Sequence, residues 1–294
     1  MLSVNKLGLG TVQWGLRYGL ANQNGLTPPE TVREILSEAR SYGITILDTA
    51  SLYGESEAVL GANSLEGFKV VTKTPRFATP VITDEQALNL THTFSLSLQR
   101  LSTTKVYGLL IHHADDLLVP GGEKLVAAIM ALKETGVVEK IGVSVYHSDQ
   151  IDAVLKIIKP DLVQLPISVL DQRLLLNGQL ERMKNMGIEI HARSVFLQGL
   201  LLMPLNRIPP YFDPIRPLLA RWRAAAEGQG LTPVQAALSF VRDISYVDTV
   251  LVGVENLEQF RSCCVDFSVS GTFDASGLAC HDPMYINPAL WNRA

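Results

Sequence analysis

The sequence predicts a single-domain α/β fold, a TIM (β/α)8 barrel, on three observations. Short apolar segments alternate with amphipathic segments along most of the 294 residues. Eight of the apolar segments lack a polar face, as is typical of parallel strands that helices cover. No shift in composition or low-complexity linker divides the chain. Because a barrel of about 250 residues fits this length, residues 1–294 are expected to form one domain.

The rival architecture is a doubly wound sheet, which usually carries a G-x-G-x-x-G motif after its first strand. Here the first predicted strand itself holds only two glycines, Gly8 and Gly10, and Thr11 follows it with no further glycine of the motif. A closed barrel is therefore favoured. Its predicted strands are Lys6–Gly10, Ile44–Asp48, Lys69–Thr74, Tyr107–His112, Lys140–Ser144, Leu162–Leu165, Glu189–Ala192 and Thr249–Val252.

Helices are predicted between these strands. Thr27 is expected to cap the first helix, with Pro28 and Pro29 in its first turn, and the helix ends near Gly43. A last, short helix begins near Asn256. The others are expected over Ser56–Asn63, Asp84–Leu101, Gly122–Thr135, Ser148–Lys159, Leu174–Met186, Ile215–Glu227 and Thr232–Asp243.

Two segments are expected to cover the mouth of the barrel. Pro204–Pro217 contains five prolines and is predicted to be an irregular loop after strand seven. Residues 265–294 show no clear helix or strand pattern and are predicted to form a C-terminal tail near the barrel mouth.

Composition excludes several classes of protein. With 25 Lys and Arg against 29 Asp and Glu, the net charge of -4 argues against a nucleic-acid-binding surface. No apolar run approaches the ~18–20 residues that cross a bilayer, and the N-terminus lacks the apolar core of a signal peptide. The three cysteines form no metal-ligand pattern, so neither a metal site nor a disulfide framework is expected. We therefore expect the protein to be cytoplasmic.

Polar residues stand at the predicted C-terminal ends of three consecutive strands. These are Asp48, Lys73 and His112, and Tyr53 follows Asp48 by five residues. Each alone has an ordinary structural explanation, such as a capping carboxylate, a solvated lysine or a packed tyrosine. In a barrel, however, these strand ends meet at one mouth, where barrel enzymes place their active sites. Their convergence predicts a proton-transfer site.

The residue types indicate which proton is transferred. A phenol with a pKa near 10 is a weak acid, and a neighbouring ammonium is expected to lower that pKa. Asp48 would hold Lys73 in place, while His112 orients a carbonyl oxygen beside Tyr53. Such a site protonates a carbonyl oxygen as a hydride reaches the carbon. Since no side chain supplies a hydride, a nicotinamide cofactor is implied.

Several motifs resemble those of the aldo-keto reductases. The most specific is LDTASLYGESE, which begins at Leu47 and is followed by Leu60 and Gly61. The resemblance runs from Leu7 to about Gln259, and it implies a TIM barrel that binds NADP(H) or NAD(H) without a Rossmann domain. The other matching motifs are LGLGT from Leu7, TKT from Thr72, LIH from Leu110 and GVVEKIGVS from Gly136.

The resemblance also implies roles for individual residues. Tyr53 matches the general acid/base, Lys73 and Asp48 the pair that tunes it, and His112 the residue that orients the carbonyl. Substrate-binding roles are implied for Trp14, Tyr53, His112 and His113. The matching cofactor-binding positions are Gly10, Thr11, Asp48, Ser144, Gln164, Arg193, Ser194, Phe196, Leu197, Gly199, Gly253 and Gln259.

The chain departs from the family pattern at three positions. His113 stands where many members carry a pocket tryptophan, so a more polar pocket is expected. Val145 replaces an asparagine that contacts the cofactor carboxamide. Arg193 takes the place of an aromatic residue that stacks on the nicotinamide, a role that a planar guanidinium can also fill.

Two further segments bear on substrate and cofactor. VQWG from Val12 and QLPIS from Gln164 are similar to bacterial members near aldose dehydrogenases and surface-sugar biosynthesis, which suggests a sugar-like small-molecule carbonyl substrate. After the last strand, Glu255 and Glu258 suit a free ribose 2′-hydroxyl. Arg261 is the one cation in that stretch, and either Arg261 or Arg193 could reach a 2′-phosphate. Because the family mostly uses NADP(H), this cofactor is expected to be favoured modestly, and NAD(H) is also expected to bind.

Two other functions stay open. One is a nicotinamide-binding regulatory subunit with vestigial catalysis, as in the β subunits of voltage-gated potassium channels, although all four catalytic positions are filled here. The other is a barrel lyase that forms a Schiff base on Lys73, which would leave Asp48 and Tyr53 unexplained. The sequence does not indicate the reaction direction or the oligomeric state.

Overall fold

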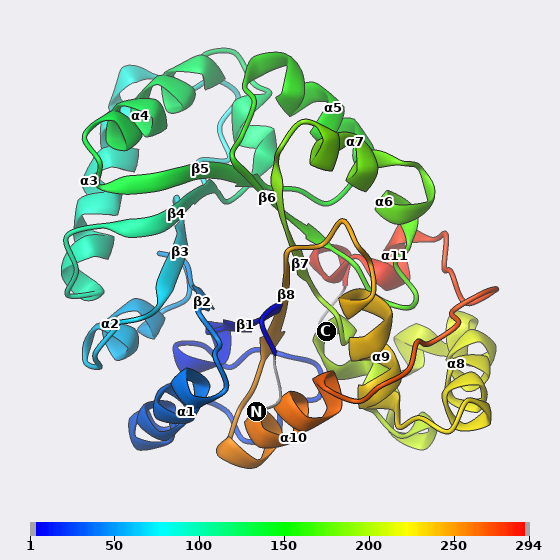
Figure 1. Ribbon diagram of the computed structural model, residues 1–294. Helices are drawn as coiled ribbons and strands as arrows, with labels where there is room; N and C mark the ends of the chain where they lie inside the picture. Colours follow the sequence, from blue (N-terminus) through cyan, green and yellow to red (C-terminus); the bar gives the residue numbers. More distant parts are fainter. Residues whose placement is uncertain (1–3, 292–294) are drawn as a thin grey trace.

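The computed structural model describes residues 4–291. Neighbouring strands pair in parallel and β8 pairs with β1, so the sheet closes into a barrel (Figure 1). The predicted fold is confirmed, and every predicted strand lies within two residues of an observed one. The strands are β1 (Leu7–Gly10), β2 (Ile46–Asp48), β3 (Lys69–Lys73), β4 (Val106–Ile111), β5 (Val138–Ser144), β6 (Leu162–Pro166), β7 (Glu189–Arg193) and β8 (Thr249–Gly253).

Helices follow the strands and surround the barrel (Figure 1). Threonine side chains cap two of them: Thr83 accepts from the backbone of Gln86, and Thr232 from that of Gln235. The helices are α1 (Pro29–Ser41), α2 (Ser56–Gly61), α3 (Asp84–Arg100), α4 (Gly122–Glu134), α5 (Ser148–Ile157), α6 (Arg173–Leu176), α7 (Gln179–Asn185), α8 (Arg216–Gly228), α9 (Pro233–Arg242), α10 (Leu257–Phe267) and α11 (Pro283–Ile286).

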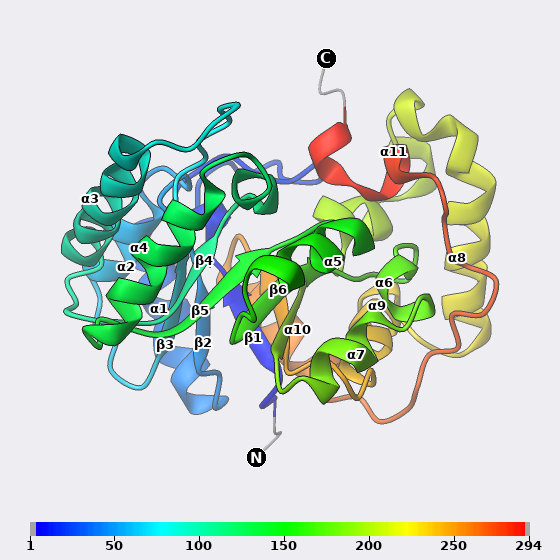
Figure 2. The ribbon, with the colours of Figure 1, turned by 90° about the horizontal axis from the view of Figure 1, so that it is seen from above.

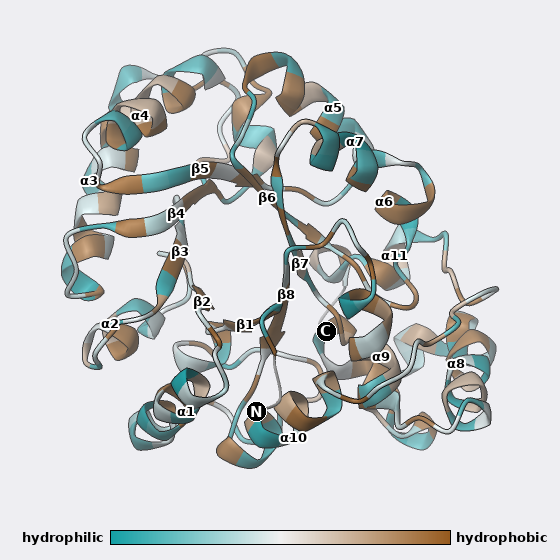
Figure 3. Ribbon diagram, viewed as in Figure 1, coloured by the Kyte–Doolittle hydropathy of each residue, from teal (hydrophilic) through white to brown (hydrophobic). Residues whose placement is uncertain are grey.

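The apolar residues form two clusters. The larger one fills the layer between strands and helices, and Figure 3 shows hydrophobic residues along the strands and parts of the helices. The smaller one includes Val71 of β3, Leu110 of β4 and Leu251 of β8, and its members come from strands all round the barrel. The barrel interior is therefore packed with side chains, which leaves its ends as places for a ligand.

Two predicted helix details are wrong. Pro28 occupies the N-cap of α1, and the Thr27 hydroxyl, instead of capping the helix, is buried with no hydrogen-bond partner among residues 4–291. The helix predicted over Leu174–Met186 is broken into α6 and α7 at Gly178, whose φ of +76° is unfavourable for other residues.

The segment Pro204–Pro217 is less irregular than predicted. It contains 3₁₀ helices at Leu205–Arg207 and Pro210–Ile215, and α8 begins within it at Arg216. The segment packs against the C-terminal tail, because the Tyr211 hydroxyl donates to the Met284 carbonyl at 2.9 Å.

The C-terminal tail also has more structure than predicted, since α10 continues to Phe267 and α11 follows later. Figure 2 shows the tail passing α8 to reach α11 at the side opposite the N-terminus. Residues 292–294 of the predicted tail lie outside the described residues.

Within residues 4–291, no helix combines the length and the apolar character that a membrane span requires.

Candidate active site

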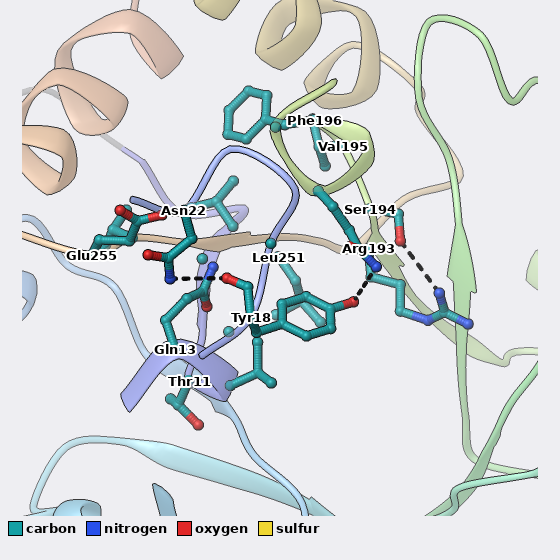
Figure 4. Close-up of a pocket in the computed structure, with 18 of the residues that line it drawn as sticks. Thr11, Gln13, Tyr18, Asn22, Arg193, Ser194, Val195, Phe196, Leu251 and Glu255 are labelled. Carbon is teal, nitrogen blue, oxygen red and sulfur yellow. Dashed lines mark hydrogen bonds between the residues drawn. The ribbon is translucent and has the colours of Figure 1, made fainter. Parts of the chain in front are cut away.

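A cavity of about 600 Å³ lies at the C-terminal ends of the strands. Figure 4 shows residues from the β1–α1 loop, β7 and β8 around it. The structure thus gathers strand ends from the whole barrel into one pocket. The sequence-predicted residues that line it are Gly10, Thr11, Asp48, Tyr53, His112, Ser144, Gln164, Arg193, Ser194, Phe196, Gly199, Gly253 and Gln259.

Four predicted site residues do not line the cavity. Trp14 and Leu197 are fully buried in the main apolar core, which explains why they do not reach a ligand there. Lys73 lies beneath the cavity floor, where it contacts Asp48. His113 stacks on the His112 ring, with ring centroids 4.8 Å apart, and it stays behind that ring.

Asp48 and Lys73 form a buried ion pair. The Lys73 Nζ donates to both carboxylate oxygens, at 2.8 and 2.7 Å, and to the Thr49 carbonyl at 2.8 Å. Because β2 and β3 are neighbours, the two strand ends bring these groups together. Burial lowers the pKa of Lys73, and Asp48 opposes that shift. All three N–H groups of the Lys73 ammonium therefore have an acceptor.

Tyr53 stands above this pair. Its backbone N–H donates to the Ala50 carbonyl at 3.0 Å in a tight turn, and Lys73 Nζ is 5.0 Å from the ring centroid. Burial raises the pKa of the Tyr53 phenol, and the Asp48 carboxylate raises it further, whereas Arg193 opposes them. The phenol is therefore a protonated donor at neutral pH.

The expectation that Lys73 lowers the pKa of the Tyr53 phenol is wrong for this structure, because the ammonium is not a free charge beside the phenol. In the structure the charge of Lys73 is paired with Asp48, and the partial burial of Tyr53 penalises the phenolate.

His112 faces Tyr53 across the cavity. The two ring centroids are 5.8 Å apart and the rings are nearly perpendicular, at 80°. Burial lowers the pKa of His112 to about 2, and the charges of Lys73, His113 and Arg193 lower it as well. The imidazole is therefore neutral, and its buried Nδ1 has no hydrogen-bond partner among the described residues.

Gln164 and Ser144 add amide and hydroxyl groups to the same floor. They are paired neighbours on β6 and β5, and both are buried while lining the cavity. The Gln164 Nε2 donates to Asp48 Oδ1 at 2.6 Å, which leaves its amide oxygen as the acceptor that it can offer a ligand.

The β1–α1 loop crosses the cavity, and sequence reasoning missed its contribution. Tyr18 and Asn22 line the pocket, and the Gln198 carbonyl accepts hydrogen bonds from the backbone of Leu20 and Ala21, at 2.9 and 3.3 Å. The loop therefore joins the β7–α8 segment above the pocket (Figure 4). The sequence signal for this contact is Gly199. A side chain there would place its Cβ 2.5 Å from the Cβ of Ala21 in the loop, which is too close.

The far end of the cavity is formed by β8 and the start of α10. Asn256 caps α10 by accepting from the Gln259 backbone at 2.8 Å. Glu255 accepts from Asn24 Nδ2 at 3.2 Å, and burial raises the pKa of its carboxyl group. Arg261 lies outside the cavity, where its Nε donates to Glu38 of α1 at 2.9 Å.

Three comparisons relate this chain to known proteins. Residues 6–268 match the model of the Aldo/keto reductase family. The 6-dehydroglucose reductase of Novosphingobium aromaticivorans is 27% identical over 256 residues, which cover 80% of this chain and 79% of that protein. The NADH-specific methylglyoxal reductase of Escherichia coli is 27% identical over 233 residues, which cover 70% and 68%.

A solved structure shows the same fold. The holo form of an aldo-keto reductase from Bacillus halodurans superposes with a TM-score of 0.73 at 22% identity, over 90% of this chain and 87% of that one. The family model spans nearly the whole barrel, including every strand that contributes to the cavity. The chain therefore belongs to the aldo/keto reductase family of oxidoreductases.

Proposed function

We propose that this protein interconverts an aldehyde or ketone and its alcohol with a nicotinamide cofactor, and that Tyr53 exchanges the proton. The observation that carries this proposal is the arrangement of three groups. A protonated phenol and the neutral imidazole of His112 share one cavity, and the Asp48 carboxylate at its floor is neutralised by Lys73.

The cavity suits a dinucleotide. It extends from Tyr53 to Glu255, and its volume of about 600 Å³ exceeds what a small carbonyl compound needs. The Gln13 side chain lines it, and the buried Gln13 Oε1 has no partner among the described residues. Ser144 and Gln164 would hold the carboxamide of the nicotinamide. The bound nicotinamide supplies the hydride.

The side chains divide the remaining work. Tyr53 donates a proton to the carbonyl oxygen during reduction and accepts it during oxidation. His112, neutral because of its lowered pKa, hydrogen-bonds the same oxygen and orients it. Lys73 holds Asp48, whose second partner is Gln164, so the floor of the site is fixed before a ligand binds.

We further propose that NAD(H) is preferred, in contrast to the modest preference for NADP(H) that the sequence predicts. Glu255 and Glu258 line the cavity at α10, and the described lining includes no cation at that end. The predicted phosphate ligand Arg261 is held by Glu38. A 2′-phosphate, with nearly two negative charges, would face carboxylates there. One relative is named an NADH-specific methylglyoxal reductase.

The substrate is proposed to be a small, polar carbonyl compound that resembles a sugar. The relatives named for 6-dehydroglucose and methylglyoxal fit this class. Lys73 is a poor candidate for a Schiff base, because its Nζ is buried, carries three hydrogen bonds and does not line the cavity.

The test is a panel of aldehydes, ketones and aldoses with NADH and NADPH, followed by absorbance of the reduced nicotinamide. Turnover that requires Tyr53 supports the proposal. Tight cofactor binding without turnover on any member of the panel would instead support the regulatory-subunit function. Trapping of a substrate adduct by borohydride would support the lyase.

A further inference from the structure

Arg193 is a half-buried cation without an ionic partner in the described chain. It ends β7 and lines the cavity that contains Tyr53 and His112. Its guanidinium carbon lies 4.3 Å from the centroid of the Tyr146 ring. Its hydrogen bonds go to the Ser194 hydroxyl at 3.3 Å and to the Val145 carbonyl at 3.2 Å (Figure 4 shows the first).

These contacts orient the guanidinium and leave donors available. A guanidinium has five N–H groups, and both hydrogen bonds are made by the terminal nitrogens to neutral oxygens. Stacking on Tyr146 and bonding to the Val145 carbonyl hold the plane in place. An oriented guanidinium of this kind matches the two oxygens of a carboxylate or a phosphate.

The carboxylates around this part of the mouth are already engaged. Asp48 is paired with Lys73, and Asp171 with Arg173 at 2.7 Å. Asp115 accepts from Gln150 Nε2 at 2.7 Å, and Asp116 accepts from two backbone N–H groups. None of them forms an ion pair with Arg193, so its positive charge has no direct counter-ion in the described chain.

A second cation reinforces this charge. Arg76, on the loop after β3, is exposed and makes no ion pair within residues 4–291. Burial lowers the pKa of His113, and the charges of Arg76 and, less strongly, Arg193 lower it as well, whereas the Asp116 and Asp115 carboxylates oppose that shift. The two guanidinium groups therefore act on the histidine pair at the mouth.

We propose that Arg193 binds an oxyanion group, a carboxylate or a phosphate, on the carbonyl substrate, so that the enzyme selects acidic aldehydes or ketones over neutral ones. This inference rests on the proposed reductase function. It narrows the substrate class to sugar-like or short carbonyl compounds that carry a negative charge near the reacting carbonyl.

The experiment compares matched substrates that differ in charge. Succinic semialdehyde is paired with the methyl ester of 4-oxobutanoic acid, and glyceraldehyde 3-phosphate with glyceraldehyde, all with NADH. We expect kcat/KM to favour at least one acidic member about tenfold or more, the effect of one charged hydrogen bond. The carboxylate and phosphate pairs separate the two oxyanions.

The Arg193→Gln variant should lower the ratio of kcat/KM for the acidic member to that for the neutral member about tenfold, whatever its effect on turnover in general, and Arg193→Lys should restore part of that ratio. Arg221→Gln, on the exposed face of α8, is the matched control and should change neither ratio. A guanidinium with a merely structural role would lower activity on both members of a pair equally.

Other outcomes overturn the inference. If the wild-type kcat/KM for the neutral member equals that for the acidic member in both pairs, Arg193 does not select charged substrates. The proposed reductase function is then unaffected. If Arg193→Gln weakens NADH binding tenfold, measured by nicotinamide fluorescence, and leaves the substrate ratio unchanged, Arg193 serves the cofactor. If neither pair is reduced although other carbonyl compounds of the wider panel are, the inference alone fails. If no member of that panel is reduced, the proposed function itself fails.

Discussion

Lys73 donates to both carboxylate oxygens of Asp48, at 2.8 and 2.7 Å, and both side chains are buried at the floor of the cavity. The two opposite charges are in direct contact, and the Asp48 carboxylate still raises the pKa of the Tyr53 phenol. A buried ion pair of this kind is costly to break, because the group left behind has neither solvent nor a counter-ion. This explains how the site keeps a charged floor and a protonated phenol at the same time.

Tyr53→Phe should lower carbonyl reduction by about 10²–10⁴, the usual contribution of a positioned acid. The ring stays in place and only the hydroxyl is lost, so NADH should bind as in wild type. Steady-state rates and a fluorescence titration of NADH test this together. A variant that keeps more than half of the wild-type turnover would exclude Tyr53 as the proton donor.

Lys73→Met should lose both activity and stability, since it leaves Asp48 buried without a counter-ion. We expect the free energy of unfolding to fall by about 3–5 kcal/mol. Denaturant melts provide the measurement. The double variant Lys73→Met/Asp48→Asn, which removes both charges, should regain most of the stability without regaining activity. Equal stability of the single and double variants would contradict the pairing.

The rate of carbonyl reduction should not depend on the ionisation of His112. Because burial and nearby cations hold the pKa of His112 at about 2, the imidazole is neutral throughout pH 5–8. The pH profile of kcat/KM should therefore lack a break near 6.5. A break in that range that disappears in His112→Gln would show that the imidazole titrates.

Glu255→Gln should shift cofactor choice toward NADPH. Removing the carboxylate that lines the α10 end of the cavity removes its repulsion of a 2′-phosphate. We expect the ratio of the NADH to the NADPH dissociation constant to rise about tenfold, and Glu30→Gln, on the exposed face of α1, to leave it unchanged. Wild-type affinity for NADPH equal to or above that for NADH would refute the proposed preference.

Glu189 should make stability depend on pH. Burial alone would raise its pKa, but hydrogen bonds from His191, Lys140 and Tyr107 outweigh burial and hold the pKa at about 2. Since the folded-state pKa lies below the ordinary 4.5, this stabilisation is complete above about 4.5 and is lost as the pH falls toward 2. Because solvent screens a partly exposed carboxylate, it should amount to roughly 1–2 kcal/mol.

Urea melts of wild type and Glu189→Gln at several pH values measure this contribution of Glu189 to the free energy of unfolding. The two proteins should differ most at pH 6–7 and converge as the pH falls toward 2. A difference that is constant with pH would mean that the substitution acts through packing alone.

Local patterns were sufficient to predict the barrel. Apolar runs identified all eight strands, because a strand covered on both faces must be apolar whatever lies next to it. Strand ends of a parallel barrel share one mouth, so the positions of Asp48 and His112 in the cavity also followed from the sequence. The break at Gly178 was not predicted, since helical periodicity continues across it.

Only the tertiary structure decided which of these side chains are charged, paired or accessible. Arg261 lies close in sequence to the expected phosphate site, yet Glu38, 223 residues away, holds it elsewhere. Trp14 is near the motif of the first loop but is buried in the core. The protonation of Tyr53 likewise depends on burial and on Asp48. Sequence spacing fixes the backbone position of a residue, whereas its pKa and its partners depend on long-range contacts and on exclusion of water.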